Sequence, residues 1–303
     1  MNLSVTIGNL KLKNPVMTAS GTFGYGEEYS EFVDLNKLGA IVVKGISLKP
    51  MEGNPPPRIW ETACGMLNSI GLQNVGLKKF VEEKLPYLKQ FNTPVIANIL
   101  ANTIHGYVQL SKALDYSGVE GIELNVSCPN VKKGGISFGT DKKTLVRLIS
   151  KVRQSVKNAV LITKLSPNVS SIQEFAKIAE DSGSDAISLI NTIPGMAIDV
   201  ETRKPRLANI TGGLSGPAIK PVAVRMVWES YDAVKIPIIG MGGIINAVDA
   251  IEFMLAGATA VAVGTANFIN PKAVENIIAG IEDYFERKGI TDVKEIIGGM
   301  NAT

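Results

Sequence analysis

Residues 121–140 read GIELNVSCPNVKKGGISFGT, a stretch that joins one strand to one polar loop. From Ile122 to Val126 apolar and polar residues alternate, which is the period-2 pattern of a β-strand. The pattern stops at Cys128-Pro129, because proline cannot donate a hydrogen bond within a sheet. A thiol at a junction between strand and loop can meet a substrate, whereas a structural cysteine usually lies inside an element. We take Cys128 as the candidate reactive residue and expect the loop from Pro129 to Thr140 to close over it.

Similar apolar runs, most of them rich in valine and isoleucine, recur along the chain with helical patterns between them. Including the first, there are eight: Pro15–Ala19, Ile41–Lys44, Pro94–Ile99, Gly121–Ser127, Leu161–Leu165, Ala186–Asn191, Ile236–Gly240 and Ala260–Gly264. Amphipathic stretches such as Lys142–Lys157, Ile172–Ser182 and Ala218–Val234 lie between them. Strands that alternate with helices imply a parallel sheet, and eight such units favour a closed barrel over an open sheet. The pattern therefore predicts an α/β fold, a single (β/α)8 TIM barrel.

The ends of the chain add further elements to this barrel. Val5–Leu12 reads as a hairpin with a two-residue turn at Gly8-Asn9, which we expect to cover the bottom of the barrel. Pro271–Lys288 reads as a closing helix, and a shorter helix is expected near Asp292–Ile297. No linker or shift in composition marks a second domain, so residues 1–303 are predicted to form one domain with an insertion or lid at its carboxyl face.

Composition excludes several classes of protein. Hydrophobic residues make up 45% and charged residues 19% of the 303 residues, as in a well-buried globular enzyme. The net charge of +3 comes with no basic run interleaved with aromatics, so we expect no nucleic-acid partner. The two cysteines form neither a disulfide framework nor a four-cysteine iron–sulfur cluster. No signal-peptide core or membrane-spanning run is present, so we expect a cytoplasmic protein that does not associate with membranes.

Two reactive residues lack a supporting motif. His105 is the only histidine, and no cysteine or carboxylate lies near it at metal-ligand spacing, so we predict no metal site. Cys64 stands in a segment without a partner motif and is interpreted as passive.

Glycines follow the seventh and eighth predicted strands, at Gly242-Gly243 and Gly264-Thr265. Barrels of this kind commonly bind phosphate there, since backbone N–H groups approach an anion closely only where side chains are absent. Gly212-Gly213 and Gly216 are interpreted as a third glycine-rich turn. One such turn is explained well enough by ordinary loop geometry, but two in these positions favour a phosphate site.

Polar residues also gather at the predicted carboxyl ends of other strands. Lys44 and Lys164 each end an apolar run, where an ammonium needs an anionic or accepting partner unless it reaches solvent. The amides of Asn68, Asn98, Asn125 and Asn191 both donate and accept hydrogen bonds, and suit the edge of a planar heterocycle. Each asparagine alone fits a simple turn role. Their number at one face favours a ligand site.

Three motifs together resemble the dihydroorotate dehydrogenase family. They are NSIGLQN at 68–74, NVSCPN at 125–130 and IGMGGI at 239–244, and the likeness extends from Thr18 to Thr265. The stretch VKKGGISFG at 131–139 resembles the class 1B catalytic subunits, which pass electrons to NAD through a partner. The fumarate-using class 1A looks different here, and class 2 enzymes carry a serine base and a membrane-associating extension.

The resemblance implies FMN on this chain and a set of contact residues. The positions that match its flavin contacts are Ser20, Lys44, Gly45, Asn98, Asn125, Lys164, Ile190, Gly216, Gly242, Gly243, Gly264 and Thr265. Those that match its substrate contacts are Lys44, Asn68, Ser69, Ile70, Gly71, Leu72, Asn125, Asn191 and Thr192, and Cys128 matches the catalytic base. The resemblance also implies a homodimer of this chain. Each copy would join a smaller subunit with FAD and a 2Fe-2S cluster, which gives a heterotetramer.

The expected reaction is oxidation of dihydroorotate to orotate in pyrimidine biosynthesis, with NAD as the final acceptor. Cys128 would remove the C5 proton while a hydride passes from C6 to the flavin. Three alternatives remain open: a flavoprotein that reduces uracil or thymine, like dihydropyrimidine dehydrogenase; a fumarate-dependent class 1A enzyme; and a non-catalytic barrel that serves only for docking.

Overall fold

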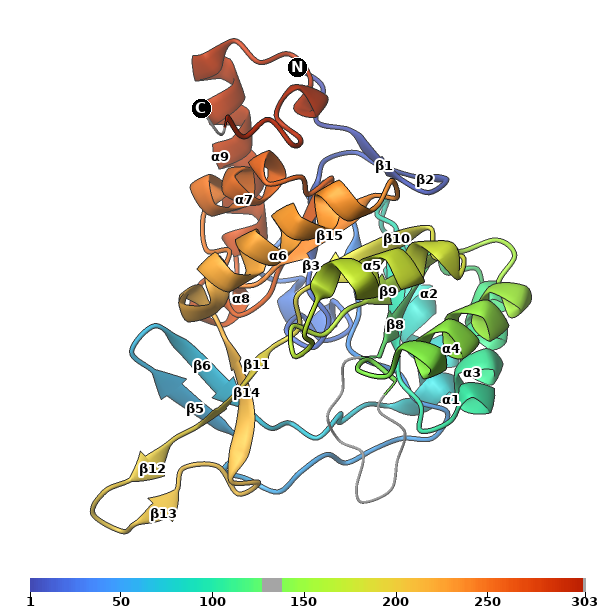
Figure 1. Ribbon diagram of the computed structural model, residues 1–303, viewed down its shortest axis with the longest axis vertical. Helices are drawn as coiled ribbons and strands as arrows, with labels where there is room; N and C mark the ends of the chain where they lie inside the picture. The colour runs from blue at the N-terminus through green and yellow to red at the C-terminus, as the bar shows by residue number, and fades with distance from the viewer. Residues whose placement is uncertain (127–137, 302–303) are drawn as a thin grey trace.

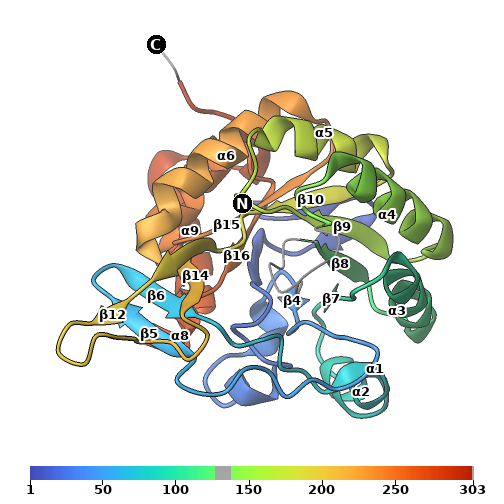
Figure 2. The same ribbon diagram turned by 60° about the horizontal axis from the view of Figure 1, so that its bottom comes forward.

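The computed structural model describes residues 1–126 and 138–301. Within these ranges eight parallel strands form one sheet in the order β3-β16-β15-β10-β9-β8-β7-β4. They confirm the eight predicted runs as β3 (Val16–Thr18), β4 (Ile41–Val42), β7 (Val95–Ile99), β8 (Gly121–Asn125), β9 (Val160–Lys164), β10 (Ala186–Leu189), β15 (Ile238–Met241) and β16 (Ala260–Val263). Figure 2 shows these strands inside a ring of helices. Because helices cover the sheet, the strands are buried and read as continuous apolar runs.

The sheet closes into a barrel at β3. On one side β3 pairs in parallel with β16, which places Thr18 opposite Val263. On the other side Met17 forms a parallel bridge with Ala40, and the Thr18 N–H donates to the Ala40 carbonyl at 3.3 Å. The first barrel strand therefore touches both the second and the last, as the predicted (β/α)8 barrel requires.

Helices surround the barrel (Figure 1). The longer ones are α3 (Ile104–Ser117), α4 (Lys142–Ser155), α5 (Ile172–Asp181), α6 (Lys220–Ala233), α7 (Ala247–Leu255) and α9 (Ala273–Lys288). Shorter segments are α1 (Gly76–Lys79), the π-helical turn Phe80–Lys84, α2 (Leu85–Leu88), α8 (Ala266–Ile269) and 3-10 turns at Glu27–Tyr29, Leu35–Lys37, Pro217–Ile219 and Val293–Glu295. Side-chain caps fix several starts; Asp141, for example, accepts the Thr144 N–H at 2.8 Å. The predicted amphipathic stretches and closing helix thus correspond to α4, α5, α6 and α9.

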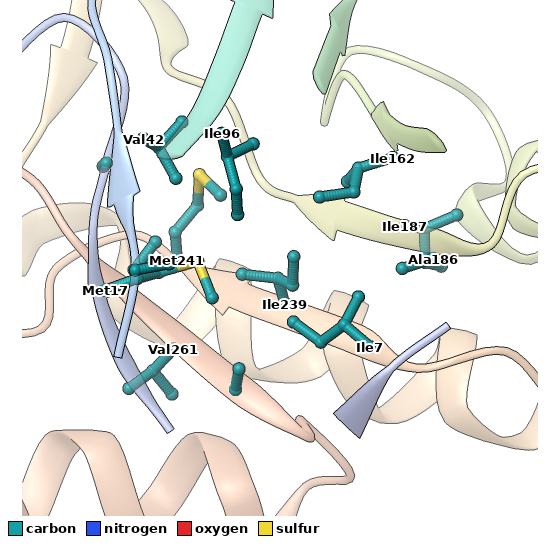
Figure 3. Packing of buried hydrophobic residues seen from close by; sticks show 14 of the residues in the cluster. Ile7, Met17, Val42, Ile96, Ile162, Ala186, Ile187, Ile239, Met241 and Val261 are labelled. Carbon is teal, nitrogen blue, oxygen red and sulfur yellow. The ribbon is translucent and has the colours of Figure 1, made fainter. Parts of the chain in front are cut away.

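The N-terminal hairpin covers the bottom of the barrel, as expected. β1 (Val5–Ile7) and β2 (Leu10–Leu12) pair antiparallel around the two-residue turn, where Gly8 has φ 58°. Ile7 is fully buried in the core, and Figure 3 shows it among Ile187 and Ile239 of the barrel strands. The hairpin therefore closes the end of the barrel opposite to the carboxyl ends of the strands.

A second sheet, which was not predicted from the sequence, is inserted at the carboxyl face. Its order is β11-β14-β6-β5, formed by β5 (Ile59–Thr62), β6 (Gly65–Asn68), β11 (Ile193–Met196) and β14 (Thr211–Ser215). A two-stranded arm of β12 (Ile198–Asp199) and β13 (Lys204–Pro205) extends from it, away from the barrel (Figure 1). The insertion expected at this face is therefore built by segments that follow β4 and β10. The predicted lid from Pro129 to Thr140 lies mostly outside the described residues.

One glycine prediction is wrong. Gly212-Gly213 does not form a turn but lies within β14, paired with β11 and β6. A Cβ atom on Gly213 would come within 2.1 Å of the Thr192 hydroxyl oxygen, and one on Gly212 within 2.6 Å of the Asn68 carbonyl oxygen. Close packing within the inserted sheet, and not a tight turn, therefore requires these two glycines.

Candidate active site

A cavity of about 820 Å³ opens at the carboxyl ends of the barrel strands, beneath the inserted sheet. Apart from Cys128, every residue that the sequence analysis selected for flavin or substrate contact lines it. These residues are Ser20, Lys44, Gly45, Asn68, Ser69, Ile70, Gly71, Leu72, Asn98, Asn125, Lys164, Ile190, Asn191, Thr192, Gly216, Gly242, Gly243, Gly264 and Thr265. Such a volume suits a cofactor together with a small substrate. The structure brings these residues together, and their individual roles as ligand contacts remain predictions.

The glycines after β15 and β16 leave backbone open to the cavity. Gly242 has φ 124° and Gly243 has φ 83°, a region that residues with a side chain rarely adopt. A Cβ atom on Gly243 would come within 2.7 Å of the Lys220 Cβ and 2.9 Å of the Gly216 carbonyl oxygen. Nearby, the Thr265 hydroxyl donates to the Ser215 hydroxyl at 2.8 Å. This corner of the cavity therefore combines side-chain-free backbone with hydroxyls, the chemistry that a phosphate needs.

Lys164 is almost completely buried, with 4% of its surface exposed, at the end of β9. Its ammonium donates to the Ser20 hydroxyl at 3.0 Å and lies 3.7 Å from the Glu123 carboxylate. Glu123 in turn accepts from the Asn98 amide at 2.6 Å and from the Ser188 hydroxyl at 2.7 Å. Asn98 and Lys164, which line the cavity, thus share the buried Glu123 carboxylate, one through a hydrogen bond and the other through an ion pair.

Lys44 follows β4, the second barrel strand, and lines the same cavity. Among the described residues no ion pair or hydrogen bond engages its ammonium, although its backbone N–H donates to the Gly24 carbonyl at 2.9 Å. Burial, followed by the charge of Arg58, lowers the pKa of Lys44, while Glu28 acts in the opposite direction. A carboxylate ligand placed here would relieve both unfavourable effects.

The segment 68–72 brings amides and backbone into the cavity from the inserted sheet. Asn68 donates to the Gly213 carbonyl at 3.3 Å, which ties β6 to β14. The Ser69 hydroxyl is buried without a partner in the described part of the chain. Gly71 and Leu72 have φ 76° and 62°, so the chain makes a tight left-handed turn here. This segment therefore offers the cavity one unpaired hydroxyl, that of Ser69, together with the backbone of a tight turn.

Of the three remaining reactive residues, the structure describes Cys64 and His105, and neither lines the cavity. Cys128 lies outside the described residues. Cys64 is exposed and free. His105 lies in the first turn of α3, and no cluster of three or more metal-ligating side chains occurs in the residues that the structure describes.

Comparison with known proteins agrees with this arrangement. The family model described as dihydroorotate dehydrogenase matches residues 2–285. The chain belongs to the dihydroorotate dehydrogenase family. Proteins named dihydroorotate dehydrogenase B (NAD(+)), catalytic subunit, are similar over its whole length. The one from Geotalea uraniireducens strain Rf4 is 59% identical over 300 residues, or 99% of this chain and 98% of that protein. Those from Thermoanaerobacter sp. strain X514 and Geobacter metallireducens are 57% and 58% identical over 300 residues each, covering 99% of this chain and 99% and 98% of theirs.

Within this dihydroorotate dehydrogenase fold, sequence reasoning missed two charged residues of the cavity region. Glu123 was read only as the polar half of an alternating strand, yet its side chain points into the barrel and is 2% exposed. Arg58 lines the cavity, where it donates to the Gln73 side chain at 2.7 Å. A charged residue in the middle of an apolar barrel strand was the available signal for Glu123. For Arg58, in a segment without a periodic pattern, the sequence carried no such signal.

Across the described ranges, no helix has the length and apolar character needed to cross a membrane.

Proposed function

We propose that this chain oxidises (S)-dihydroorotate to orotate in de novo pyrimidine biosynthesis, as a single FMN-binding barrel domain over residues 1–303. The observation that carries the proposal is that one cavity is lined by the predicted flavin and substrate residues other than Cys128, which come from strands and loops distant in sequence. Membership of the dihydroorotate dehydrogenase family supports the same reaction.

The residues present fit FMN. The glycine backbone at Gly242-Gly243 and Gly264 with the Thr265 hydroxyl would hold the phosphate. The side-chain amide oxygen of Asn98 (Oδ1) is buried and has no partner in the described residues, so it offers an acceptor to a ring N–H. Lys164 would place positive charge beside the ring. Ser20, Lys44, Gly45, Asn125, Ile190 and Gly216 complete the proposed flavin contacts. When bound, FMN supplies a hydride acceptor for C6 of the substrate.

The substrate would lie between Lys44 and the segment 68–72. Lys44 would pair with the substrate carboxylate, which also compensates the burial that lowers the pKa of this lysine. The amides of Asn68, Asn125 and Asn191, with Thr192, would bind the edge of the pyrimidine ring. Ser69 to Leu72 would supply backbone and hydroxyl contacts. Charge pairing at the carboxylate and hydrogen bonds at the ring would together orient C5 and C6.

Cys128 is the proposed base for the C5 proton, on the strength of its sequence context alone. A free thiol has a pKa of about 8.5, and only the thiolate accepts a proton. Proton abstraction at neutral pH therefore requires surroundings that favour the thiolate. The polar loop after Cys128 would exclude water during the reaction.

The names of the relatives describe a catalytic subunit and NAD(+). We propose that electrons leave this chain for NAD through a second subunit that carries FAD and a 2Fe-2S cluster. A homodimer of this chain with two such subunits gives a heterotetramer, located in the cytoplasm.

The deciding experiment is anaerobic mixing of the FMN-loaded chain with dihydroorotate. Bleaching of the flavin absorbance and formation of orotate are expected. Turnover of uracil but not dihydroorotate would favour a dihydropyrimidine dehydrogenase-like enzyme. A colourless protein that takes up no FMN would favour a docking barrel. Co-purification of a cluster-bearing chain needed for NAD reduction is expected, whereas efficient use of fumarate by the isolated chain would overturn the NAD assignment.

A further inference from the structure

The Glu123 carboxylate lies inside the barrel and is 2% exposed. Glu123 is not among the residues predicted to contact a ligand. It lies on β8 with Asn98 of β7 directly opposite in the strand register. Its two oxygens have different partners: one accepts from the Asn98 amide nitrogen at 2.6 Å, and the other accepts from the Ser188 hydroxyl at 2.7 Å. A buried carboxylate needs charge pairing and hydrogen bonds to persist, and this one has both.

The carboxylate fixes which end of the Asn98 amide faces the cavity. An ionised carboxylate only accepts hydrogen bonds, so the NH2 group of Asn98 must face Glu123 and its carbonyl oxygen must point away. That oxygen lies on the side of Gly45, where a Cβ atom would come within 3.0 Å of it. It is buried and has no hydrogen-bond partner in the described chain. Asn98 is therefore oriented as an acceptor whose donor must come from a ligand, and a flavin ring carries one N–H group.

The same carboxylate holds the buried ammonium. Lys164 Nζ lies 3.7 Å from the Glu123 oxygen that binds Asn98, and 3.0 Å from the Ser20 hydroxyl. The lysine is 4% exposed and lies on the neighbouring strand β9, two residues beyond Ile162, which is the register partner of Glu123. A charged group with so little exposure to water needs polar or charged partners to remain buried. Glu123 thus connects an acceptor and a cation that both face the cavity.

The geometry points to Glu123 as a positioning residue for the flavin: it orients Asn98 as an acceptor toward the cavity and balances the charge of Lys164, which lines the same cavity. This inference rests on the proposed function, because it assumes that FMN occupies the cavity. It predicts two separable effects. Loss of the orientation weakens binding of oxidised FMN, and loss of the negative charge makes the reduced, more negative flavin relatively easier to form.

Glu123→Gln keeps the size of the side chain but removes its charge and adds an N–H donor. Titration of the apoprotein with FMN, followed by flavin fluorescence, is expected to show a dissociation constant at least tenfold higher than wild type. The midpoint potential of the bound flavin is expected to shift to more positive values. Glu123→Asp keeps the charge, so its potential is expected to stay nearer to wild type. A purely structural role would not move the potential. Unchanged affinity and potential in Glu123→Gln would overturn the inference.

Two further variants complete the test. Ser188→Ala tests the inference if Glu123→Gln does not fold, and Asp115→Asn is a control. Ser188→Ala removes one hydrogen bond to Glu123 and keeps the charges, and is expected to weaken FMN binding about threefold. If Glu123→Gln does not fold, equal binding by Ser188→Ala and wild type overturns the inference. Asp115→Asn is the matched control, because Asp115 is a buried carboxylate that accepts backbone N–H groups at the amino end of β9. Its FMN affinity should equal that of wild type. Wild-type protein that binds no FMN would instead refute the proposed function.

Discussion

The hydroxyl of Thr18 forms two hydrogen bonds with the backbone of Val42: it accepts the Val42 N–H at 2.9 Å and donates to the Val42 carbonyl at 3.2 Å. β3 and β4 are short strands that are joined by few backbone hydrogen bonds, and this fully buried side chain completes their pairing. A single threonine therefore closes part of the barrel seam below the cavity.

Thr18→Val is expected to lower the free energy of unfolding by about 2–4 kcal/mol, because it leaves two buried backbone groups unpaired. Urea denaturation measures the effect. The matched control is Thr6→Val, an exposed threonine on β1, which should change stability by less than about 0.5 kcal/mol. Equal stability of the two variants would show that water or a relaxed seam satisfies Val42.

Cys128→Ala is expected to keep the bound yellow flavin and to lose its reduction by dihydroorotate at neutral pH, since the proposed base is gone. Anaerobic stopped-flow absorbance measures the reduction. The chain offers its own control in Cys64→Ala, an exposed thiol that does not line the cavity. Near wild-type reduction in Cys128→Ala would remove this residue from its proposed role.

Lys44→Met is expected to weaken orotate binding about 10–100-fold, because a charge-assisted pair with the ligand carboxylate is lost. Perturbation of the flavin spectrum reports the binding, and Lys112→Met, on the exposed face of α3, is the control. The pH dependence gives a second readout. Burial and Arg58 lower the pKa of Lys44, so affinity in wild type should fall as pH rises through that lowered value. The fall attributable to Lys44 should be absent in Lys44→Met.

Gly243→Ala is expected to reduce FMN affinity tenfold or more, because its Cβ would collide with Lys220 and with the Gly216 carbonyl in the proposed phosphate corner. Gly118→Ala is the control, because it introduces similar backbone strain without the steric collision. Gly118 has φ 84°, close to the 83° of Gly243, but a Cβ there would meet nothing within 4 Å. It should cost about 1–2 kcal/mol of stability and leave FMN binding unchanged. Similar FMN affinities for the two variants would remove the steric explanation.

Asp115→Asn is expected to destabilise the protein at neutral pH by about 2 kcal/mol through weaker backbone hydrogen bonds. Burial acts to raise the pKa of Asp115, but the N–H groups of Ala159, Asn158 and Lys157 together hold it below its usual value of 3.8. The stabilisation is therefore complete above that usual value and is lost as pH falls through the lower pKa of the folded state. Urea midpoints measured from pH 7 downward should converge for wild type and variant.

The barrel could be predicted because its strands are buried on both faces. Such strands read as short apolar runs, and eight of them in alternation with helical patterns leave few other folds. The inserted sheet could not be predicted in this way. Its strands β5 and β6 have four residues each, and the pairing of Asn68 with Gly213 joins positions 145 residues apart. No local pattern reports a contact of that separation.

The candidate site could likewise be predicted only in part. Residues at the ends of barrel strands could be placed together from topology alone, since parallel strands end at one face. The place of Glu123 in the site could not be predicted, because an alternating pattern shows that the two faces of a strand differ but does not show which face is interior. In this barrel the polar face of β8 is the inner one. Gly212-Gly213 was misassigned because close packing in a sheet and a tight turn both demand glycine.

The pairing of β3 with β16 also constrains how the protein is made. Thr18 and its partner Val263 are far apart in the sequence, so the ring stays open until β16 has left the ribosome. Gly264 and Thr265 follow directly after that last strand. A nascent chain without β16 therefore lacks both the closed wall and the proposed phosphate corner, and FMN should be loaded only after this strand and Thr265 have been synthesised.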